Sequence, residues 1–147
     1  MIIMGIDHGD VRTGVSVCDK NEMLASPVTV ITERSDVRLA QKIATLAKEY
    51  GAQQIVMGLP KNMDGSLGFR AQAILDFVPV LEEATGLPVA LRDERLSTMS
   101  AHKLLNATDT RGKKRKQSVD AVSAVLILED YLGARKRQAA ENTESIQ

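Results

Sequence analysis

The first third of the chain contains three segments with the residue patterns of β-strands. An apolar run occupies residues 1–6, Val15 and Val17 alternate with small or polar residues across 13–18, and residues 28–32 are β-branched. The connections between these segments are short and rich in turn residues, as antiparallel neighbours require. The pattern predicts a three-stranded antiparallel meander.

Beyond residue 34 the apolar spacing changes to that of amphipathic helices separated by short strands. Leu39, Ile43 and Ala47 recur at helical spacing between an N-cap candidate at Ser35 and a stop at Gly51. The other predicted elements are a strand over 54–58, a helix with apolar positions over 74–81 that closes at Gly86, a strand over 88–92, a helix from Ser97 or Thr98 through Leu105, and a last helix over 118–132.

This order of elements predicts an α/β fold with one five-stranded mixed sheet flanked by helices. Strand-helix-strand units favour parallel pairing, so the first, fourth and fifth strands are expected to be parallel, with the meander as an antiparallel edge. Binding sites in such sheets lie beyond the carboxyl ends of the parallel strands. The rule selects the loops at residues 7–14, 59–68 and 93–98.

Length and composition predict one globular domain in a reducing compartment. The 147 residues suffice for a single core, and we expect a domain over 1–133 followed by a polar, frayed tail over 134–147. Cys18 is the sole cysteine, which excludes an internal disulfide and favours the cytoplasm. The apolar start is too short for a signal segment or a membrane span, so no membrane association is expected.

Acidic residues follow two of the predicted parallel strands and open the last helix. Asp7 ends the first strand, Asp93 and Glu94 end the fifth, and Asp120 lies in the first turn of the last helix. Each has an ordinary explanation by itself: a turn former, a partner for Arg95, or a charge that stabilises a helix N-terminus. Their convergence on one edge is not explained in that way. Asp93 and Glu94 should point to opposite faces of the sheet, and either could join the cluster.

Clustered carboxylates indicate a site for divalent cations. They repel one another unless a cation neutralises them, and oxygen ligands suit Mg²⁺ or Mn²⁺. Two such ions, about 3.5–4 Å apart, can activate water and stabilise the leaving oxygen during hydrolysis of a phosphodiester. The sequence contains no P-loop or HExxH motif and no evident Ser-His-Asp arrangement. We therefore expect a metal-dependent hydrolase.

Local positive charge supplies candidate contacts for phosphate. Lysine and arginine total 19 and are balanced by 19 acidic residues, yet five of the six residues over 111–116 are basic. A solvated basic loop is the alternative explanation, although its position just before Asp120 favours a role at the site. A purely structural loop over 58–66 is likewise compatible with the sequence. The candidate substrate-binding residues are Arg12, Lys61, Asn62, Arg70, Arg95, Lys113, Lys114, Arg115 and Lys116.

Several motifs, taken together, resemble the YqgF/RuvX family. They are Asp-x-Gly-x-x-Arg-x-Gly at 7–14, Gly-Leu-Pro-x-Asn-Met-Asp-Gly at 58–65, Asp-Glu-Arg-Leu-Ser-Thr at 93–98, and the basic segment 111–116 before Asp120. The resemblance implies a ribonuclease H-like fold related to Holliday junction resolvases, with Asp7, Glu94 and Asp120 as catalytic metal ligands. It also implies a nuclease that matures the 5′ end of precursor 16S ribosomal RNA, on its own or on ribosomal particles. Junction resolution is the older proposal for the family.

Two departures from the family pattern occur beside Asp7. His8 stands where the family usually has an aromatic residue, and Asp10 adds a carboxylate to the first turn. Neither change removes a candidate ligand. Aromatic residues make up only 3% of the chain, which leaves few platforms for stacking on bases, so recognition is expected to use backbone charge and shape.

Other functions and assemblies remain compatible with the sequence. The glycine hairpin at 7–14 also occurs in actin-like ATPases and sugar kinases, but 147 residues do not provide the second domain that closes over nucleotide. A nucleic-acid-binding module without activity would keep the same fold. The choice between RNA and branched DNA, and between a monomer and a homodimer, stays open.

Overall fold

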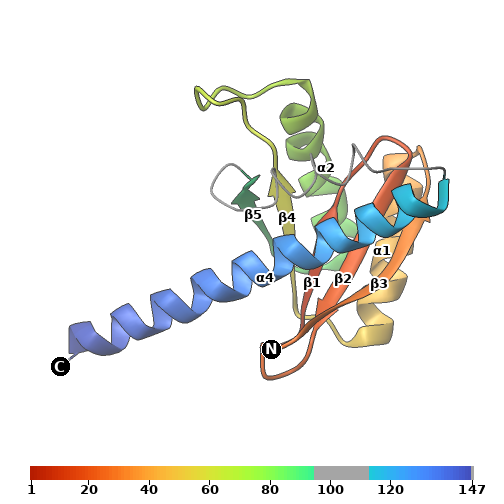
Figure 1. Ribbon diagram of the computed structural model, residues 1–147. Helices are drawn as coiled ribbons and strands as arrows, with labels where there is room; N and C mark the ends of the chain where they lie inside the picture. Colours follow the sequence, from red (N-terminus) through yellow and green to blue (C-terminus); the bar gives the residue numbers. More distant parts are fainter. Residues whose placement is uncertain (95–112, 147) are drawn as a thin grey trace.

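One five-stranded sheet lies between two layers of helices (Figure 1). The computed structural model describes residues 1–94 and 113–146, with side chains described for 1–94 and 121–142. The strands follow the order β3-β2-β1-β4-β5, with β1 and β4 parallel, β4 and β5 parallel, and the β1-β2 and β2-β3 pairs antiparallel. This confirms the predicted meander and parallel half. The strands are β1 (Ile3–Asp7), β2 (Arg12–Cys18), β3 (Ala25–Thr32), β4 (Gln54–Leu59) and β5 (Val89–Asp93).

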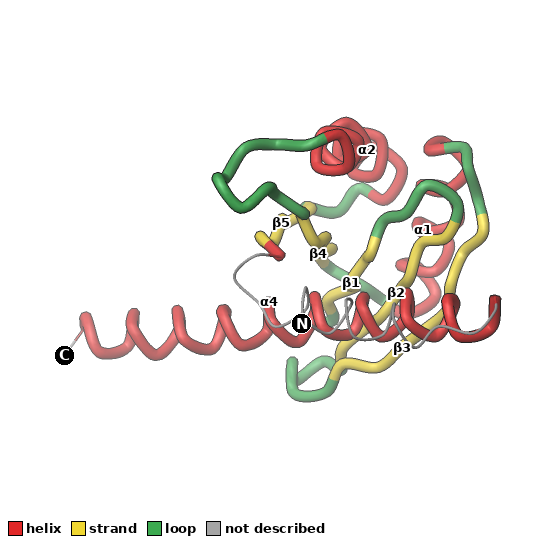
Figure 2. The backbone as a smooth tube through the Cα atoms, turned by 45° about the horizontal axis from the view of Figure 1, so that its top comes forward, coloured by secondary structure: helices red, strands yellow, loops and turns green. Residues whose placement is uncertain are grey.

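Helices α1 (Asp36–Tyr50) and α2 (Phe69–Thr85) pack together on one face of the sheet (Figure 2). The Ser35 side chain caps α1 by accepting a hydrogen bond from the backbone N–H of Arg38, as the sequence predicts. The larger hydrophobic core fills the space between these helices and the sheet. Its most buried members include Met4, Ile6, Val15, Leu39, Ile43, Ile55, Met57, Ile74, Phe77 and Leu81.

The opposite face of the sheet is covered by α4 (Lys113–Ile146), which crosses β1, β2 and β3 obliquely (Figures 1 and 2). A second core cluster joins the two layers. Its sheet residues are Ile3, Cys18, Ala25 and Val56, and its α4 residues are Ile127, Leu128 and Leu132. Among the described helices none is both long and apolar enough to cross a membrane. The helix predicted over 97–105 lies outside the described residues.

The bounds predicted for the last helix are wrong, because α4 begins at Lys113 and continues to Ile146. The prediction followed the apolar periodicity, which stops near Leu132. Residues 134–146 contain no glycine or proline and are rich in good helix formers, so the helix continues through the segment expected to fray. The division of the chain at residue 133 stays a prediction.

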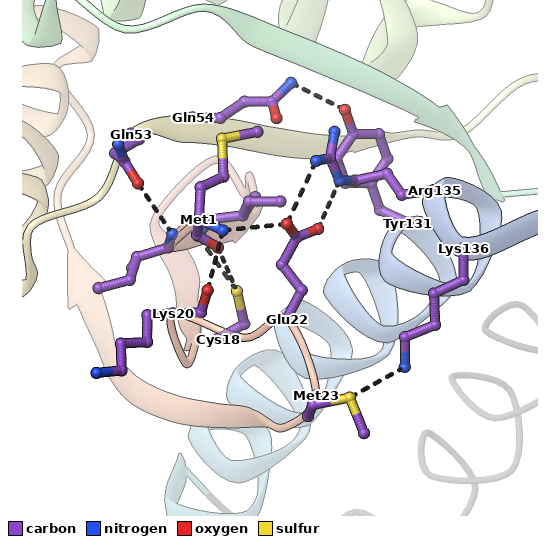
Figure 3. A network of polar contacts seen from close by, with 12 residues as sticks. Met1, Cys18, Lys20, Glu22, Met23, Gln53, Gln54, Tyr131, Arg135 and Lys136 are labelled. Atoms are coloured by element: carbon purple, nitrogen blue, oxygen red, sulfur yellow. Dashed lines mark hydrogen bonds and ion pairs between the residues drawn. The ribbon is translucent and has the colours of Figure 1, made fainter. Parts of the chain in front are cut away.

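A polar network fixes α4 to the sheet at the end opposite Asp7 (Figure 3). Arg135 Nε lies 2.6 Å from Glu22 Oε1, and the Met1 ammonium lies 3.0 Å from Glu22 Oε2. These hydrogen bonds, the one from Arg135 above all, lower the pKa of Glu22. Gln54, at the start of β4, donates to the Tyr131 hydroxyl at 2.8 Å.

Small residues let the backbone of α4 approach the sheet very closely. Ser16 Oγ donates a 2.7 Å hydrogen bond to the Ala124 carbonyl and lies 3.4 Å from the Gly5 carbonyl. A Cβ atom on Gly5 would lie 2.8 Å from the Ala124 oxygen and 2.9 Å from Leu128 Cβ. The helix therefore occupies space that any larger residue at position 5 would fill.

We predict that replacement of glycine by alanine changes the free energy of unfolding in opposite directions at Gly5 and at Gly133. Gly5→Ala should destabilise the protein by about 1–3 kcal/mol, because the added methyl group overlaps α4. Gly133→Ala, inside α4, should stabilise it by about 0.5–1 kcal/mol, since its Cβ would meet only Arg137 at 3.5 Å. Urea unfolding of both variants measures these differences. Equal effects would contradict the close approach at Gly5.

Candidate active site

Asp7 lies at the carboxyl end of β1 on the face that α4 covers. Ile3 belongs to the α4-side cluster and Gly5 contacts α4, whereas Met4 and Ile6 belong to the core on the other face. Side chains alternate along a strand, so Asp7 shares the face of Ile3 and Gly5. Only 9% of Asp7 is exposed. The strand therefore presents a largely buried carboxyl group under the helix layer.

Glu94, not Asp93, shares this face at the end of β5. Val89 packs against the α1-α2 side, while Ala90 packs against the α4-side cluster. Arg92 is paired with Asp130 of α4, which continues the alternation. Glu94 follows two residues later and is 8% exposed. The contacts of β5 with α4 thus decide between the two adjacent acids that the sequence left open.

Gly58 provides the space in which the Glu94 carboxyl group lies. A Cβ atom at Gly58 would lie 2.5 Å from Glu94 Oε1 and 2.8 Å from Ile127 Cδ1. Met57 is paired with Ile6 in the parallel register, so Gly58 lies beside Asp7 on the next strand. The Glu94 carboxyl group therefore lies over the strand position adjacent to Asp7. Two largely buried carboxyl groups from distant parts of the sequence therefore lie on the same face of this edge.

The backbone of α4 brings Asp120 to the sheet-facing side of the helix. Asp120 precedes Ala124 by four residues, one helical turn, and Ala124 lies against Gly5. Its side chain is outside the described residues, as are those of the predicted phosphate contacts Lys113, Lys114, Arg115 and Lys116. Arg95 lies wholly outside them. The roles of these residues stay predictions.

His8 lies on the opposite face from Asp7. Its ring centroid is 4.7 Å from that of Phe77, and its Nε2 lies 3.6 Å from Asp36 Oδ1. Burial and the nearby Arg70 cation lower the pKa of His8, which favours the neutral ring. His8 thus packs between the sheet and the two helices.

Arg70 ties the first turn of α2 to the hairpin that follows Asp7. Its Nη2 donates to the His8 carbonyl at 2.6 Å and lies 3.1 Å from His8 Nδ1. Its Nη1 is 2.5 Å from Asp10 Oδ1. Local sequence patterns do not predict this clamp, because the contacting residues are about 60 positions apart. Asp10, the extra acid in the hairpin, was the one available signal.

The loop between β4 and α2 is held by its own hydrogen bonds. The Asn62 backbone N–H donates to the Ser66 carbonyl at 3.0 Å, and the Asn62 side-chain amide donates to Ser66 Oγ at 3.0 Å. Asn62 thus has a structural role here, while Lys61 is partly exposed at the start of the loop. Arg12 begins β2 in the same edge region. Their contacts with a substrate stay predictions.

The chemistry of this edge fits a divalent cation. Asp7 and Glu94 supply carboxylate oxygens, which Mg²⁺ and Mn²⁺ prefer, and burial of such groups is unfavourable unless they are paired. Within residues 1–94 and 121–142 no three His, Cys, Asp or Glu side chains form a metal-binding group. A third ligand would therefore have to come from the rest of the chain, where Asp120 is the candidate.

This sheet order with carboxylates at the edge defines the ribonuclease H-like class, and solved structures confirm the fold. The Thermus thermophilus RuvC structure in complex with a Holliday junction substrate matches with a TM-score of 0.57 at 15% identity, covering 92% of this chain and 96% of that one. The fowlpox virus Holliday junction resolvase matches with a TM-score of 0.52 at 12% identity, covering 91% and 99%.

Sequence comparison shows the family. The family model described as "RuvX: Holliday junction resolvase" matches residues 1–134. A relative from Desulfitobacterium hafniense is 43% identical over 98% of this chain and all of its own length, and one from Halothermothrix orenii is 42% identical over 93% and 98%. Both carry the name "Putative pre-16S rRNA nuclease". The chain belongs to the RuvX family, a family of nucleases, which confirms the resemblance seen in its motifs.

We predict that Gly58→Ala displaces the Glu94 carboxyl group. The added methyl group would occupy the position next to Glu94 Oε1, so metal-dependent activity should fall by more than about tenfold. Calorimetric titration with Mn²⁺ should show a matching loss of affinity. Gly133→Ala is the control with the same added methyl group far from the edge. Unchanged Mn²⁺ affinity in Gly58→Ala would contradict the assigned geometry.

Proposed function

We propose that this chain is a cytoplasmic nuclease that processes the 5′ end of precursor 16S ribosomal RNA, free or in ribosomal particles. The names of relatives up to 43% identical over nearly the whole chain support this substrate. The observation that carries the catalytic part is the placement of the largely buried Asp7 and Glu94 on the α4 face at the carboxyl edge of the sheet, where Gly58 leaves room for the Glu94 carboxyl group.

Asp7, Glu94 and Asp120 would hold two Mg²⁺ or Mn²⁺ ions. Such ions supply an activated water and stabilise the charge that develops on the phosphodiester oxygens. The protein orients the ligands. The ladder of β1 and β2, in which Asp7 is paired with Gly14, fixes Asp7. The pairing of Arg92 with Asp130 fixes the end of β5, and the contact at Gly5 fixes the helix that carries Asp120.

Cationic residues around the edge would grip the phosphates of the substrate. Lys113, Lys114, Arg115 and Lys116 form the first turn of α4, and Lys116 precedes Asp120 by four residues. Arg12 and Lys61 lie in or beside loops at the carboxyl ends of the strands, and Arg95 directly follows Glu94 in sequence. These contacts bind the phosphate backbone and not the bases. They therefore supply affinity that decreases as the salt concentration rises, and they add no base specificity.

Resolution of Holliday junctions is the second candidate. The description of the matching family model and the likeness to junction resolvases favour it. Symmetric cutting of a junction needs a two-fold dimer. A four-way DNA junction assayed beside the precursor RNA separates the two functions.

We predict that Asp7→Asn and Glu94→Gln each lower cleavage of a 5′-extended precursor 16S RNA by more than about a hundredfold. Loss of an outer partner of a metal ligand already costs 10–100-fold, so loss of a ligand should cost more. Cleavage is measured with Mg²⁺, with Mn²⁺ and with EDTA. Asp93→Asn is the matched control, because Asp93 is adjacent to Glu94 but faces away from α4.

The outcomes of this assay distinguish the candidates. Metal-dependent cleavage of the RNA alone, lost in both ligand variants and kept in Asp93→Asn, supports the proposal. Symmetric cutting of the junction alone would replace it with the resolvase function. If wild type cuts neither substrate yet binds RNA as tightly as Asp7→Asn does, the chain is a binding module and the catalytic assignment is wrong.

A further inference from the structure

We propose that Phe69 is a stacking platform for an unpaired base of the nucleic-acid substrate, beside the edge that carries Asp7 and Glu94. This inference rests on the proposed nuclease function and specifies how the same site holds its substrate. Phe69 is the first residue of α2, and 86% of it is exposed. A phenylalanine this exposed contributes little to the fold.

The other aromatic side chains do not provide such a surface at this edge. The chain has two Phe and two Tyr residues. Phe77 is fully buried, and the Tyr131 hydroxyl is hydrogen-bonded at the opposite end of the sheet. Tyr50 is 40% exposed but ends α1, where the Gln53 N–H donates to the backbone just before β1. Phe69 is therefore the strongly exposed aromatic residue at the start of α2, one position before the arginine that contacts the hairpin after Asp7.

The Arg70 clamp holds the start of α2, where Phe69 lies, against the hairpin that follows Asp7. Arg70 directly follows Phe69, and its guanidinium group binds the His8 carbonyl at 2.6 Å and Asp10 at 2.5 Å. His8 in turn directly follows Asp7. One arginine side chain thus spans the distance from the start of α2 to the hairpin that continues from Asp7. These contacts fix the backbone at the start of α2, from which the Phe69 side chain extends, relative to the hairpin after Asp7.

The segment leading to Phe69 is already ordered by internal hydrogen bonds. The Gly65 N–H donates to the Asn62 carbonyl at 2.8 Å, and Ser66 Oγ donates to Asp64 Oδ1 at 2.6 Å. Leu67, just before the helix, is 46% exposed. A loop that is ordered before binding loses less conformational entropy when a substrate settles on it. The apolar surface is therefore presented in a defined position.

An unpaired base fits this surface better than a protein partner does. Every base has an apolar face that stacks on an aromatic ring, and RNA recognition uses such contacts at single-stranded segments. Lys61, at the start of the same loop, supplies a cation for the phosphate of a stacked nucleotide. The surface lies at the start of α2, which Arg70 joins to the hairpin after Asp7, so a substrate bound at the carboxyl edge can extend onto it. We infer that the cleaved strand is unpaired near the scissile bond.

Binding of RNA that carries one 2-aminopurine tests the platform directly. In the Asp7→Asn background, which keeps the RNA intact, stacking should quench 2-aminopurine in single-stranded RNA. Adding Phe69→Ala should raise the dissociation constant, measured by fluorescence anisotropy, about tenfold. It should also remove the quenching of 2-aminopurine. Phe69→Trp should keep both, and Tyr50→Ala, an exposed aromatic residue at the other end of the sheet, should change neither. Binding of a fully paired RNA duplex should be the same with and without Phe69.

Several results of these binding measurements would contradict the stacking role of Phe69. Unchanged affinity and quenching in Phe69→Ala, or equal losses for single-stranded and paired RNA, would overturn the platform. So would failure of the parent protein to bind the single-stranded probe. If Phe69→Ala loses binding but wild type does not cleave the precursor RNA, the platform stands and the proposed substrate fails. If cleavage and binding are both normal in Phe69→Ala, the proposed function stands and the platform fails.

Discussion

The close approach of α4 to the sheet is the constraint on which the site depends. At Gly5 and Gly58 the strands carry no side chain on the helix face, and Ser16 adds a hydrogen bond to the helix backbone. The space at Gly5 is filled by the helix, whereas the space at Gly58 also holds the Glu94 carboxyl group. The lack of Cβ atoms at Gly5 and Gly58 therefore allows the helix to pack closely on the sheet and leaves room for the Glu94 carboxyl group beneath it.

The two ends of the sheet have different roles. Contacts at one end stabilise the fold, and the carboxyl groups of the candidate site lie at the other end. At the starting ends of β1 and β4, Glu22, Arg135 and Tyr131 form paired contacts that fix the second half of α4. At the carboxyl ends, Asp7 and Glu94 are largely buried, and burial of carboxylates is unfavourable unless their charge is compensated. Fixing the helix at one end allows the other end to concentrate like charges. A ribonuclease H-like nuclease would use that arrangement to bind metal.

The sequence predicted the sheet and the first two helices because their signals are local. Alternation, the Ser35 cap and the glycine stops each involve neighbouring residues. The contacts that complete the site join distant positions: Ser16 and Ala124 are 108 residues apart, and Arg70 and Asp10 are 60 apart. Alternation placed Asp93 and Glu94 on opposite faces, but only packing against α4 could decide which one accompanies Asp7. The predicted end of α4 is wrong because residues after Leu132 keep a high helix propensity although the apolar pattern has stopped.

Paramagnetic broadening by Mn²⁺ in the ¹H–¹⁵N spectrum of the wild-type protein tests most directly whether the carboxylates form one metal site. A small amount of Mn²⁺ should broaden the amide signals of Asp7, Gly58 and Glu94 first. The signals of Gln54, Glu22 and Arg135, at the opposite end of the sheet, should stay sharp. Selective broadening at that opposite end, or no selective broadening at all, would contradict a metal site at the carboxyl edge.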